Sequence, residues 1–248
     1  MIPPIVHQIW LGPDPLPEEF RRYGESWLRH NPGWELRLWT EDTLPADLSR
    51  REVYERLRQP AERSDILRLE LLERHGGVYV DTDFECLRPL APLLEGVEFF
   101  CAYLKPGRVN NAIVGATPGH ELLRRAIREV RPVEWHGKVD KHGTGPFFLD
   151  ALVKQYPDAV TIFDAELFYP RTPESRRNAV AVHHSARSWK PPEDLFKDVQ
   201  RAEAKLGTAQ DEAASLRRKY EAALAELDAL RAGSRLRALR ARLSRLRS

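Results

Sequence analysis

The chain has 248 residues, of which 42% are hydrophobic, so it can hold one sizeable packed domain, or one domain with an appendage. No segment approaches the roughly 20 apolar residues of a membrane-spanning helix, and the N-terminus lacks the pattern of a signal peptide, so we expect a cytosolic protein. The formal charge of +2 is uneven, since residues 1–196 carry −4 and residues 197–248 carry +6, which indicates two parts with different roles.

Segments of strand and helix character alternate along residues 1–193. Hydrophobic runs that end at Gly or Pro predict strands, and apolar residues three or four apart predict helices. This alternation is typical of an α/β domain with a mostly parallel sheet, whose ligands bind beyond the carboxyl ends of the strands. The expected strands are 5–10, 34–39, 78–80, 98–104, 112–115, 160–163 and 179–183, and the expected helices are 17–30, 49–58, 61–75, 119–130 and 146–155.

The predicted helix 61–75 carries Asp65 and Arg68 three positions apart, so both side chains lie on one face. One interpretation is a surface ion pair, which would contribute under ~1 kcal/mol. The other is that the pair faces a ligand, because a carboxylate and a guanidinium together match the hydroxyls of a sugar diol. The spacing alone leaves both interpretations open.

Two carboxylates follow the predicted strand 78–80, in the order Asp81-Thr82-Asp83. In an extended chain, positions i and i+2 point to the same face, so the two carboxylates should converge. Two hard oxygen ligands suit Mg²⁺ or Mn²⁺ and leave other coordination positions for phosphate oxygens. The motif therefore predicts a divalent cation that holds a diphosphate and neutralises it as it leaves.

The chain contains two cysteines, Cys86 and Cys101. Their spacing fits no metal site. A disulfide between them is possible, but two reduced thiols in a cytosolic protein is the simpler interpretation.

Residues 194–232 predict a helix with a modest coiled-coil repeat. This segment follows Pro191-Pro192 and is rich in Ala, Leu, Glu, Arg and Lys. The repeat indicates either a homodimer through this helix or a single helix that packs back on the body. One set of repeat positions is Leu206, Ala213, Tyr220 and Leu227, and the other is Ala209, Leu216, Ala223 and Leu230.

Residues 233–248 predict a basic amphipathic tail. From Arg235 onward this segment has six Arg and no acidic residue, with Leu side chains on one helical face. Such a segment suits an anionic membrane surface, and a solvated tail is the alternative. Nucleic acid is not expected as a partner, because no aromatic residues accompany the charges.

Several blocks, taken in order, resemble the DXD sugar-binding glycosyltransferases of glycosyltransferase family 32. The family includes fungal mannosyltransferases and bacterial capsular polysaccharide enzymes, and the clostridial glucosylating toxins are more distant relatives. The resemblance covers roughly residues 2–190. The blocks are Ile2 to Gly12, Asn31 to Trp39, Ser64 to Arg68, Gly76 to Asp83, Asn111 to His120, Thr144 to Pro146, and His183 to Trp189.

The resemblance implies a GT-A fold, a nucleotide-sugar donor (GDP- or UDP-linked), Mn²⁺ or Mg²⁺, and transfer with retention of anomeric configuration. It implies that Asp83 is the firmest metal ligand, that Asp81 contacts the sugar or ribose and the metal, and that His184 completes the metal shell. Asp65 and Arg68 would orient the donor sugar, and with Asp81 they are the candidate catalytic residues. The remaining implied donor contacts are Trp10 on the base, Trp189 near the diphosphate, and Asn111 and Thr144 along the sugar and acceptor pocket.

Each of these roles has a structural alternative. Strand alternation puts one of His183 and His184 in the core and one outside, so His183 remains a second candidate for the metal. Trp10 and Trp189 could pack in the core. Asn110 and Asn111 could make a turn, and Thr144-Gly145-Pro146 could simply cap the helix that follows.

The expected function is therefore transfer of a hexose from a nucleotide sugar to a hydroxyl of a saccharide or glycolipid acceptor, in surface or capsular polysaccharide synthesis. The expected location is the cytoplasm, with possible peripheral attachment to the inner face of the membrane. A non-catalytic nucleotide-sugar-binding module with an oligomerising tail is one alternative. The other is a phosphohydrolase with an Asp-x-Asp motif, although such enzymes have Thr or Val where this chain has Glu85.

Overall fold

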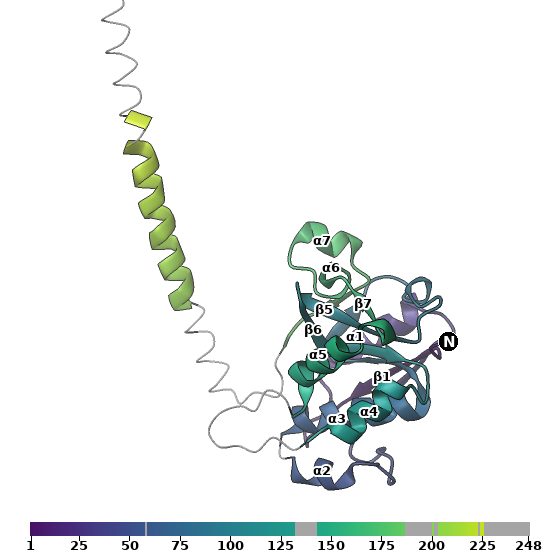
Figure 1. Cartoon of the computed structure of the whole chain (residues 1–248). Helices are drawn as coiled ribbons and strands as arrows, with labels where there is room; N and C mark the ends of the chain where they lie inside the picture. The colour runs from purple at the N-terminus through teal and green to yellow at the C-terminus, as the bar shows by residue number, and fades with distance from the viewer. Residues whose placement is uncertain (58, 132–142, 187–199, 201–202, 223, 226–248) are drawn as a thin grey trace, which may run out of the picture. The chain divides into compact units, whose positions relative to one another are not determined.

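The computed structural model of the chain describes residues 1–57, 59–131, 143–186, 200, 203–222 and 224–225 (Figure 1). The chain divides into two compact units, Met1–Trp189 and Lys190–Ser248. The first unit contains a layered α/β fold, and in the second unit residues 203–222 are helical. Among the described residues, none of the helices combines the length and the apolar character needed to cross a membrane.

A six-stranded sheet forms the centre of the first unit, with the strand order β2-β1-β3-β6-β5-β7. Three of its five pairings are parallel, namely β1 with β2, β1 with β3, and β5 with β7. Strand β6 runs antiparallel to both of its neighbours, β3 and β5. The predicted α/β class with a mostly parallel sheet is therefore confirmed. The strands are β1 Ile5–Ile9, β2 Glu35–Trp39, β3 Gly77–Val80, β5 Phe99–Lys105, β6 Arg108–Ala116 and β7 Thr161–Phe163.

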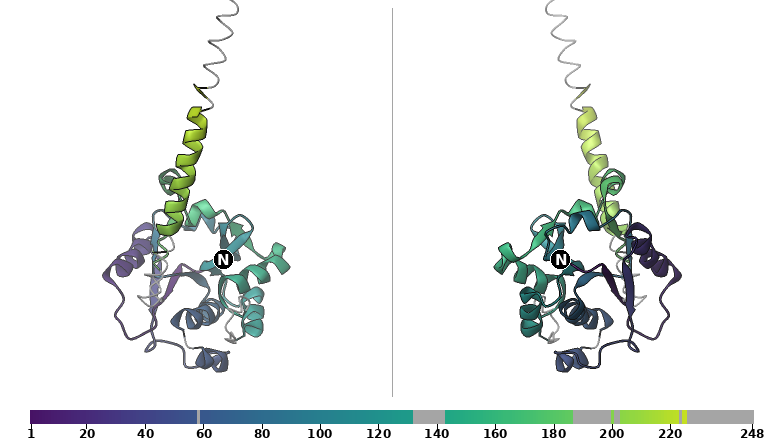
Figure 2. Two further views of the ribbon diagram at one scale, coloured as in Figure 1. Left: turned by 90° about the vertical axis from the view of Figure 1, so that its left-hand side faces the viewer. Right: turned by 90° about the vertical axis from the view of Figure 1, so that its right-hand side faces the viewer.

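Helices cover both faces of this sheet (Figure 2). One face packs on buried leucines of α3, α4 and α5, among them Leu71, Leu123 and Leu152. The other face packs on Trp27 of α1 and Phe168 of α6. The sequence anticipated helices α1 to α5 to within a few residues and missed α6 and α7, which are short. The helices are α1 Glu18–His30, α2 Arg51–Arg56, α3 Pro60–His75, α4 Glu121–Glu129, α5 Gly145–Gln155, α6 Ala165–Phe168 and α7 Pro173–Asn178.

A second, two-stranded sheet joins distant parts of the chain. Strand β4 (Phe84–Cys86) directly follows the two aspartates, and it pairs antiparallel with β8 (Ala181–His183), with Phe84 opposite His183. Strand β4 is only three residues long and was not predicted. Through this pairing, β8 and its His183 lie close to the end of β3.

Gly76 and Gly77 form the connection between helix α3 and strand β3, where the backbone passes close to neighbouring segments. Both adopt positive φ, and a Cβ on Gly77 would lie 2.6 Å from the carbonyl oxygen of Ile5. A Cβ on Gly76 would lie 2.7 Å from the backbone nitrogen of Pro118. The two glycines therefore let helix α3 turn directly into β3 against the neighbouring backbone. Both cysteines are buried and free, one in each of the two hydrophobic clusters.

His7, in the middle of β1, is a fully buried neutral imidazole. Its Nδ1 accepts a hydrogen bond from the Trp39 indole N–H (3.1 Å), and its Nε2 lies 2.9 Å from the Gly76 carbonyl oxygen. Because the indole can only donate and the carbonyl can only accept, the ring proton is on Nε2. Burial lowers the pKa of His7 to about 4.

The buried His7 predicts a pH-dependent contribution to stability. Between pH 6.5 and 4, His7 binds a proton in the unfolded chain but stays neutral in the folded chain. Protonation therefore favours the unfolded chain, and the stability present above pH 6.5 is lost as the pH falls towards 4. We expect the native chain to lose up to about 3 kcal/mol relative to a His7→Gln variant over this window. Urea unfolding of both proteins between pH 7 and 4 measures the two free energies of unfolding. Carboxyl groups titrate in both proteins, so their contribution cancels in the difference. A difference that does not change with pH would contradict the prediction.

Candidate active site

Strands β1, β2 and β3 are parallel, so their carboxyl ends meet at one edge of the sheet. Asp81 and Asp83 lie at this edge, directly after β3. The amide N–H of Asp81 still donates to the Ala112 carbonyl of β6 at 2.9 Å, and the chain then turns, with Phe84 N–H donating to the Asp81 carbonyl at 3.1 Å. The two carboxylates do converge, but through this turn rather than through the extended geometry that the sequence predicted.

The third member of this cluster is His183. Its Nε2 lies 3.1 Å from Asp83 Oδ1 and 3.7 Å from Asp81 Oδ2. One ligand atom from each of Asp81, Asp83 and His183 lies within 4.8 Å of the others, as three ligands of one metal ion must. The imidazole is held by stacking on Phe84, at a centroid distance of 4.9 Å.

His184, which was expected to join the two aspartates, lies apart from them in this structure. Its side chain stacks on Tyr23, with ring centroids 4.4 Å apart, and its Nε2 lies 3.1 Å from a carboxylate oxygen of Glu85. Alternation along β8 explains the difference, because His183 and His184 point to opposite faces and the pairing of His183 with Phe84 sets which one faces the aspartates. Only the backbone N–H of His184 contacts the motif, as a donor to the Asp83 carbonyl.

Charge is distributed within the cluster so that Asp83 is an anion. Burial raises the pKa of the Asp83 carboxyl, but His183 and the Ala186 N–H, which donates at 2.7 Å, outweigh burial and hold this pKa below its usual value. Burial also lowers the pKa of His183, and the two carboxylates outweigh it and raise that pKa. A cation bound here would replace the proton that these groups share.

Arg68 of α3 connects the aspartate cluster to buried groups of α3 and β6. Its guanidinium lies 3.0 Å from Asp65 Oδ1 and 3.4 Å from Asp81 Oδ1, and it donates to the Asn111 carbonyl at 2.5 Å. Its side chain is only 6% exposed, so the pair with Asp65 is not the surface ion pair that the sequence left open. The guanidinium also lies over the Tyr79 ring, 4.3 Å from its centroid.

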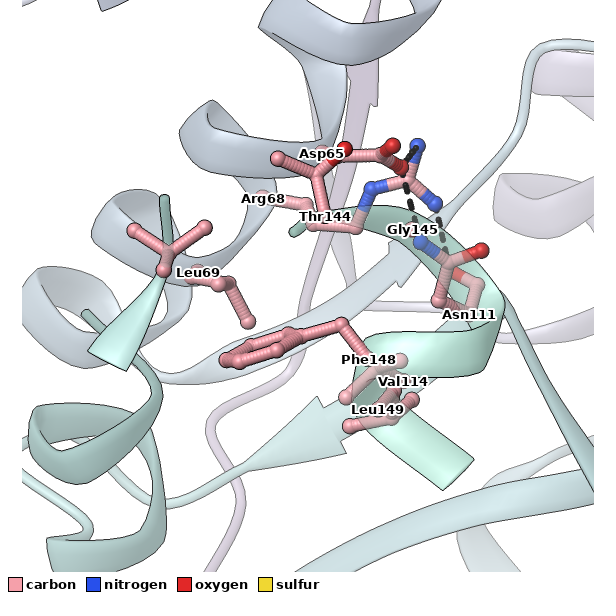
Figure 3. A pocket seen from close by; sticks show the side chains of 10 residues that line it. Asp65, Arg68, Leu69, Asn111, Val114, Thr144, Gly145, Phe148 and Leu149 are labelled. Carbon is pink, nitrogen blue, oxygen red and sulfur yellow. Dashed lines mark hydrogen bonds and ion pairs between the residues drawn. The ribbon is translucent and has the colours of Figure 1, made fainter. Parts of the chain in front are cut away.

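Asp65 lies at the rim of a small cavity of about 10 Å³ beside this arginine (Figure 3). Asn111 Nδ2 donates to Asp65 Oδ1 at 2.7 Å, and Thr144 supplies a further hydrogen bond. Burial raises the pKa of Asp65 to about 6, against the opposing charge of Arg68. In Figure 3 the polar groups of Asp65, Arg68 and Asn111 face one another, with Phe148 and Leu149 on the apolar side.

The structural alternative for Asn111 does not hold, and the one for Thr144 holds only for its position in the chain. Asn111 lies within β6 rather than in a turn. Thr144 precedes α5 at the N-cap position, but its side chain makes no capping hydrogen bond to that helix. Gly145 has φ +72°, and a Cβ there would lie 3.0 Å from Asp65 Oδ2, so the glycine gives Asp65 its space.

Of the two tryptophans expected to contact the donor, the structure describes only Trp10. Trp10 follows β1 at the same sheet edge; its indole N–H donates to the Asp14 carbonyl at 2.7 Å, and its ring packs edge-on against Phe20. Trp10 therefore lies along this edge rather than within the Arg68 network. Trp189 lies outside the described residues.

Tyr79 is a site residue that the sequence analysis missed. Its hydroxyl donates to Asp81 Oδ1 at 2.7 Å, so Asp81 receives both this phenol and the Arg68 guanidinium. A signal was available, because Tyr79 and Asp81 are two residues apart at the end of a strand and share a face.

Residues 17–100 match the family described as "Glycosyltransferase sugar-binding region containing DXD motif". The chain is 28% identical over 220 residues to "Uncharacterized glycosyltransferase L373" of Acanthamoeba polyphaga mimivirus, covering 79% of this chain and 87% of that protein. It is 30% identical over 168 residues to "Mannosyl phosphorylinositol ceramide synthase SUR1" of Saccharomyces cerevisiae, covering 63% of this chain and 43% of that protein.

A second yeast relative is "Inositol phosphoceramide mannosyltransferase 1" of Schizosaccharomyces pombe, which is 28% identical over 205 residues, covering 76% of this chain and 62% of that protein. The chain thus spans less than two thirds of the length of these two yeast proteins. Among solved structures, "PaToxG Glycosyltransferase" superposes with a TM-score of 0.51 at 18% identity, covering 63% of this chain and 70% of that one. This likeness concerns the fold, and it agrees with the GT-A arrangement described above.

Proposed function

Because the chain belongs to the glycosyltransferases whose sugar-binding region contains a DXD motif, we propose that it transfers a hexose from a nucleotide sugar to a hydroxyl group, with the help of a divalent cation and with retention of configuration. The observation that carries this proposal is the convergence of Asp81, Asp83 and His183 beside the buried Arg68–Asp65 pair. The first group suits a cation and the second suits a sugar.

The donor atoms fit a divalent cation. Two carboxylates and one imidazole are hard and intermediate ligands that suit Mn²⁺ well, whereas Mg²⁺ prefers oxygen alone. Asp83 and His183 would hold the ion, with Asp81 as a further oxygen ligand. When bound, the ion supplies positive charge to the diphosphate as that group departs.

The residues of the chain orient the donor. Arg68 donates to hydroxyls and Asp65 accepts from them, so the pair can fix one diol of the sugar ring. Tyr79 and Arg68 hold Asp81 in place through its Oδ1. In the reaction, the bond from the anomeric carbon to the phosphate oxygen breaks, the bond to the acceptor oxygen forms on the same face, and the acceptor proton passes to the departing diphosphate. No side chain is assigned as the base.

A panel of nucleotide sugars with Mn²⁺, measured for slow donor hydrolysis, tests this function. We expect release of nucleoside diphosphate from one donor, abolished by EDTA. Release of phosphate from phosphomonoesters would instead favour a phosphohydrolase, and tight nucleotide binding without turnover would favour a binding module. The names of the yeast relatives refer to mannosyl transfer, so GDP- and UDP-linked mannose, glucose and galactose form the first panel.

The acceptor that we propose is a saccharide or glycolipid of surface or capsular polysaccharide synthesis, reached from the cytoplasmic side of a membrane. Residues 233–248, the basic segment that would contact anionic lipids, lie outside the described residues. Co-sedimentation with anionic vesicles of the full chain and of a chain truncated at Lys197 tests this. Equal sedimentation of the two would contradict attachment through the tail.

The helix 203–222 supports a homodimer. Leu206, Leu216 and Tyr220 are 60%, 66% and 65% exposed, and they lie on the seven-residue repeat. Between Lys205 and Lys219 the positions that flank this seam are polar, which is the narrow stripe of a coiled coil rather than the wider stripe of a helix on a globular body. In a parallel pair, Glu212 of one helix faces Arg217 of its partner helix.

Leu216→Glu is expected to dissociate this dimer, because it places a charge in the centre of the seam. The full chain should have twice its mass of 28.6 kDa by light scattering, and the variant should have the mass of one chain at the same concentration. Ala214→Glu is the matched control, since it adds the same charge on the opposite side of the helix. A native chain with the mass of one copy would contradict the dimer.

A further inference from the structure

Tyr169 follows α6 directly and is buried in the second hydrophobic cluster, with 7% of its surface exposed. Its ring packs edge-on against Phe84, at 5.7 Å, and against His183, at 5.6 Å. Its hydroxyl has no hydrogen-bond partner within the part of the chain that the structure describes. In that part, the only other buried side-chain polar atom without a partner is Nε2 of Gln8, in β1.

A buried hydroxyl without a partner is costly. Leaving such a group unpaired costs about 1–3 kcal/mol, and nearly all buried polar groups in folded proteins are paired. Phenylalanine would fill the same space between Phe84 and His183 without this cost. Among the described residues, nothing accepts from the hydroxyl of Tyr169, so it is available to donate to a further oxygen.

The surroundings of Tyr169 point to the aspartate cluster. Its ring contacts His183, the imidazole of that cluster. Its ring also packs against Phe84, the residue directly after Asp83. Oδ1 of Asp81 already accepts from Tyr79 and Arg68, and Oδ2 of Asp81 faces His183.

We propose that Tyr169 is a positioning residue for the cation site, and that its hydroxyl donates to an oxygen bound at Asp81, Asp83 and His183, namely a water of the cation's coordination shell. This inference rests on the proposed cation site. It assigns Tyr169 two tasks, which are to fix the His183 ring by edge-on packing and to hold the oxygen that the cation brings. Groups in this position around metal sites typically change metal affinity by about 10–100-fold.

Tyr169→Phe separates the two tasks, because it keeps the ring and removes only the hydroxyl. Free Mn²⁺ is measured by electron paramagnetic resonance in titrations of the full chain, with Mn²⁺ alone as the probe. We expect the dissociation constant to rise about 10–100-fold in the variant. Tyr103→Phe, on β5, is the matched control and should bind Mn²⁺ like the native chain.

A thermal unfolding measurement without metal excludes a merely structural role. Removing an unpaired hydroxyl should leave the midpoint unchanged or raise it, whereas a hydroxyl that stabilises the fold would lower the midpoint when removed. Equal Mn²⁺ affinity of the native chain and Tyr169→Phe would overturn the inference and leave the proposed function intact. A native chain that does not bind Mn²⁺ would overturn both.

Discussion

Asp83→Asn is expected to lower the rate of metal-dependent donor hydrolysis on the order of a thousandfold, which is a loss of about 4 kcal/mol of transition-state stabilisation. Asparagine keeps the shape of the side chain but removes the charge that Asp83 offers to a cation. It also removes the anion that His183 contacts at 3.1 Å. Initial rates over a range of Mn²⁺ concentrations measure both consequences, since weaker ion binding raises the concentration that is needed.

Two neighbouring histidines provide a matched test of the same cluster. His183→Ala should reduce turnover strongly, because His183 lies beside both aspartates, whereas His184→Ala should retain it, because His184 pairs with Glu85 and Tyr23. Asp158→Asn, an exposed carboxylate in a short helical turn, controls for loss of charge alone. If Asp83→Asn hydrolysed the donor at the native rate, the site would not depend on this ligand. If His184→Ala were the inactive one, the assignment of His183 would be wrong.

Arg68→Met is expected to destabilise the first unit by about 3–5 kcal/mol, because it leaves the buried Asp65 carboxylate without its partner. For a chain of this size we expect a fall in the melting temperature on the order of 10 °C. The variant should also lose donor turnover, since the guanidinium that would bind the sugar is absent. Urea and thermal unfolding, monitored alongside donor hydrolysis, measure the two effects separately.

The double variant Asp65→Asn/Arg68→Met tests whether an unpaired Asp65 carboxylate causes the loss of stability. If the cost arises from an unpaired buried charge, removing that charge should restore part of the stability but none of the activity. Arg21→Met is the control, because Arg21 is paired with Glu18 on the exposed face of α1 and its loss should leave the midpoint unchanged. A single Arg68→Met variant as stable as the native chain would contradict the role of this ion pair.

Most of the fold could be predicted from local pattern. The five longer helices and the six strands of the main sheet follow from hydrophobic spacing and from Gly and Pro at their ends. Strand β4 was not found in this way; it has three residues and directly follows Asp83. Nor was α6, whose four residues place Tyr169 beside the site.

The site was predictable only as far as its residues are close in sequence. Asp81 and Asp83 follow one strand, and Asp65 and Arg68 share one helical face, so their grouping is a matter of local geometry. The contact of Asn111 with Asp65 joins residues that are 46 positions apart. The sequence pointed to Asn111 and Thr144 through a resemblance, and it could not assign their partners.

The sequence by itself determined that an acidic pair ends a buried strand and that a carboxylate and a guanidinium lie together on the preceding helix. Only the tertiary structure decided that His183, and not His184, faces the aspartates, because this depends on the register between β4 and β8, about 100 residues apart. A shift of one residue in that register would exchange the two imidazoles. Local periodicity determines which side chains share a face of a helix or strand. Packing between distant segments determines which residues that face contacts.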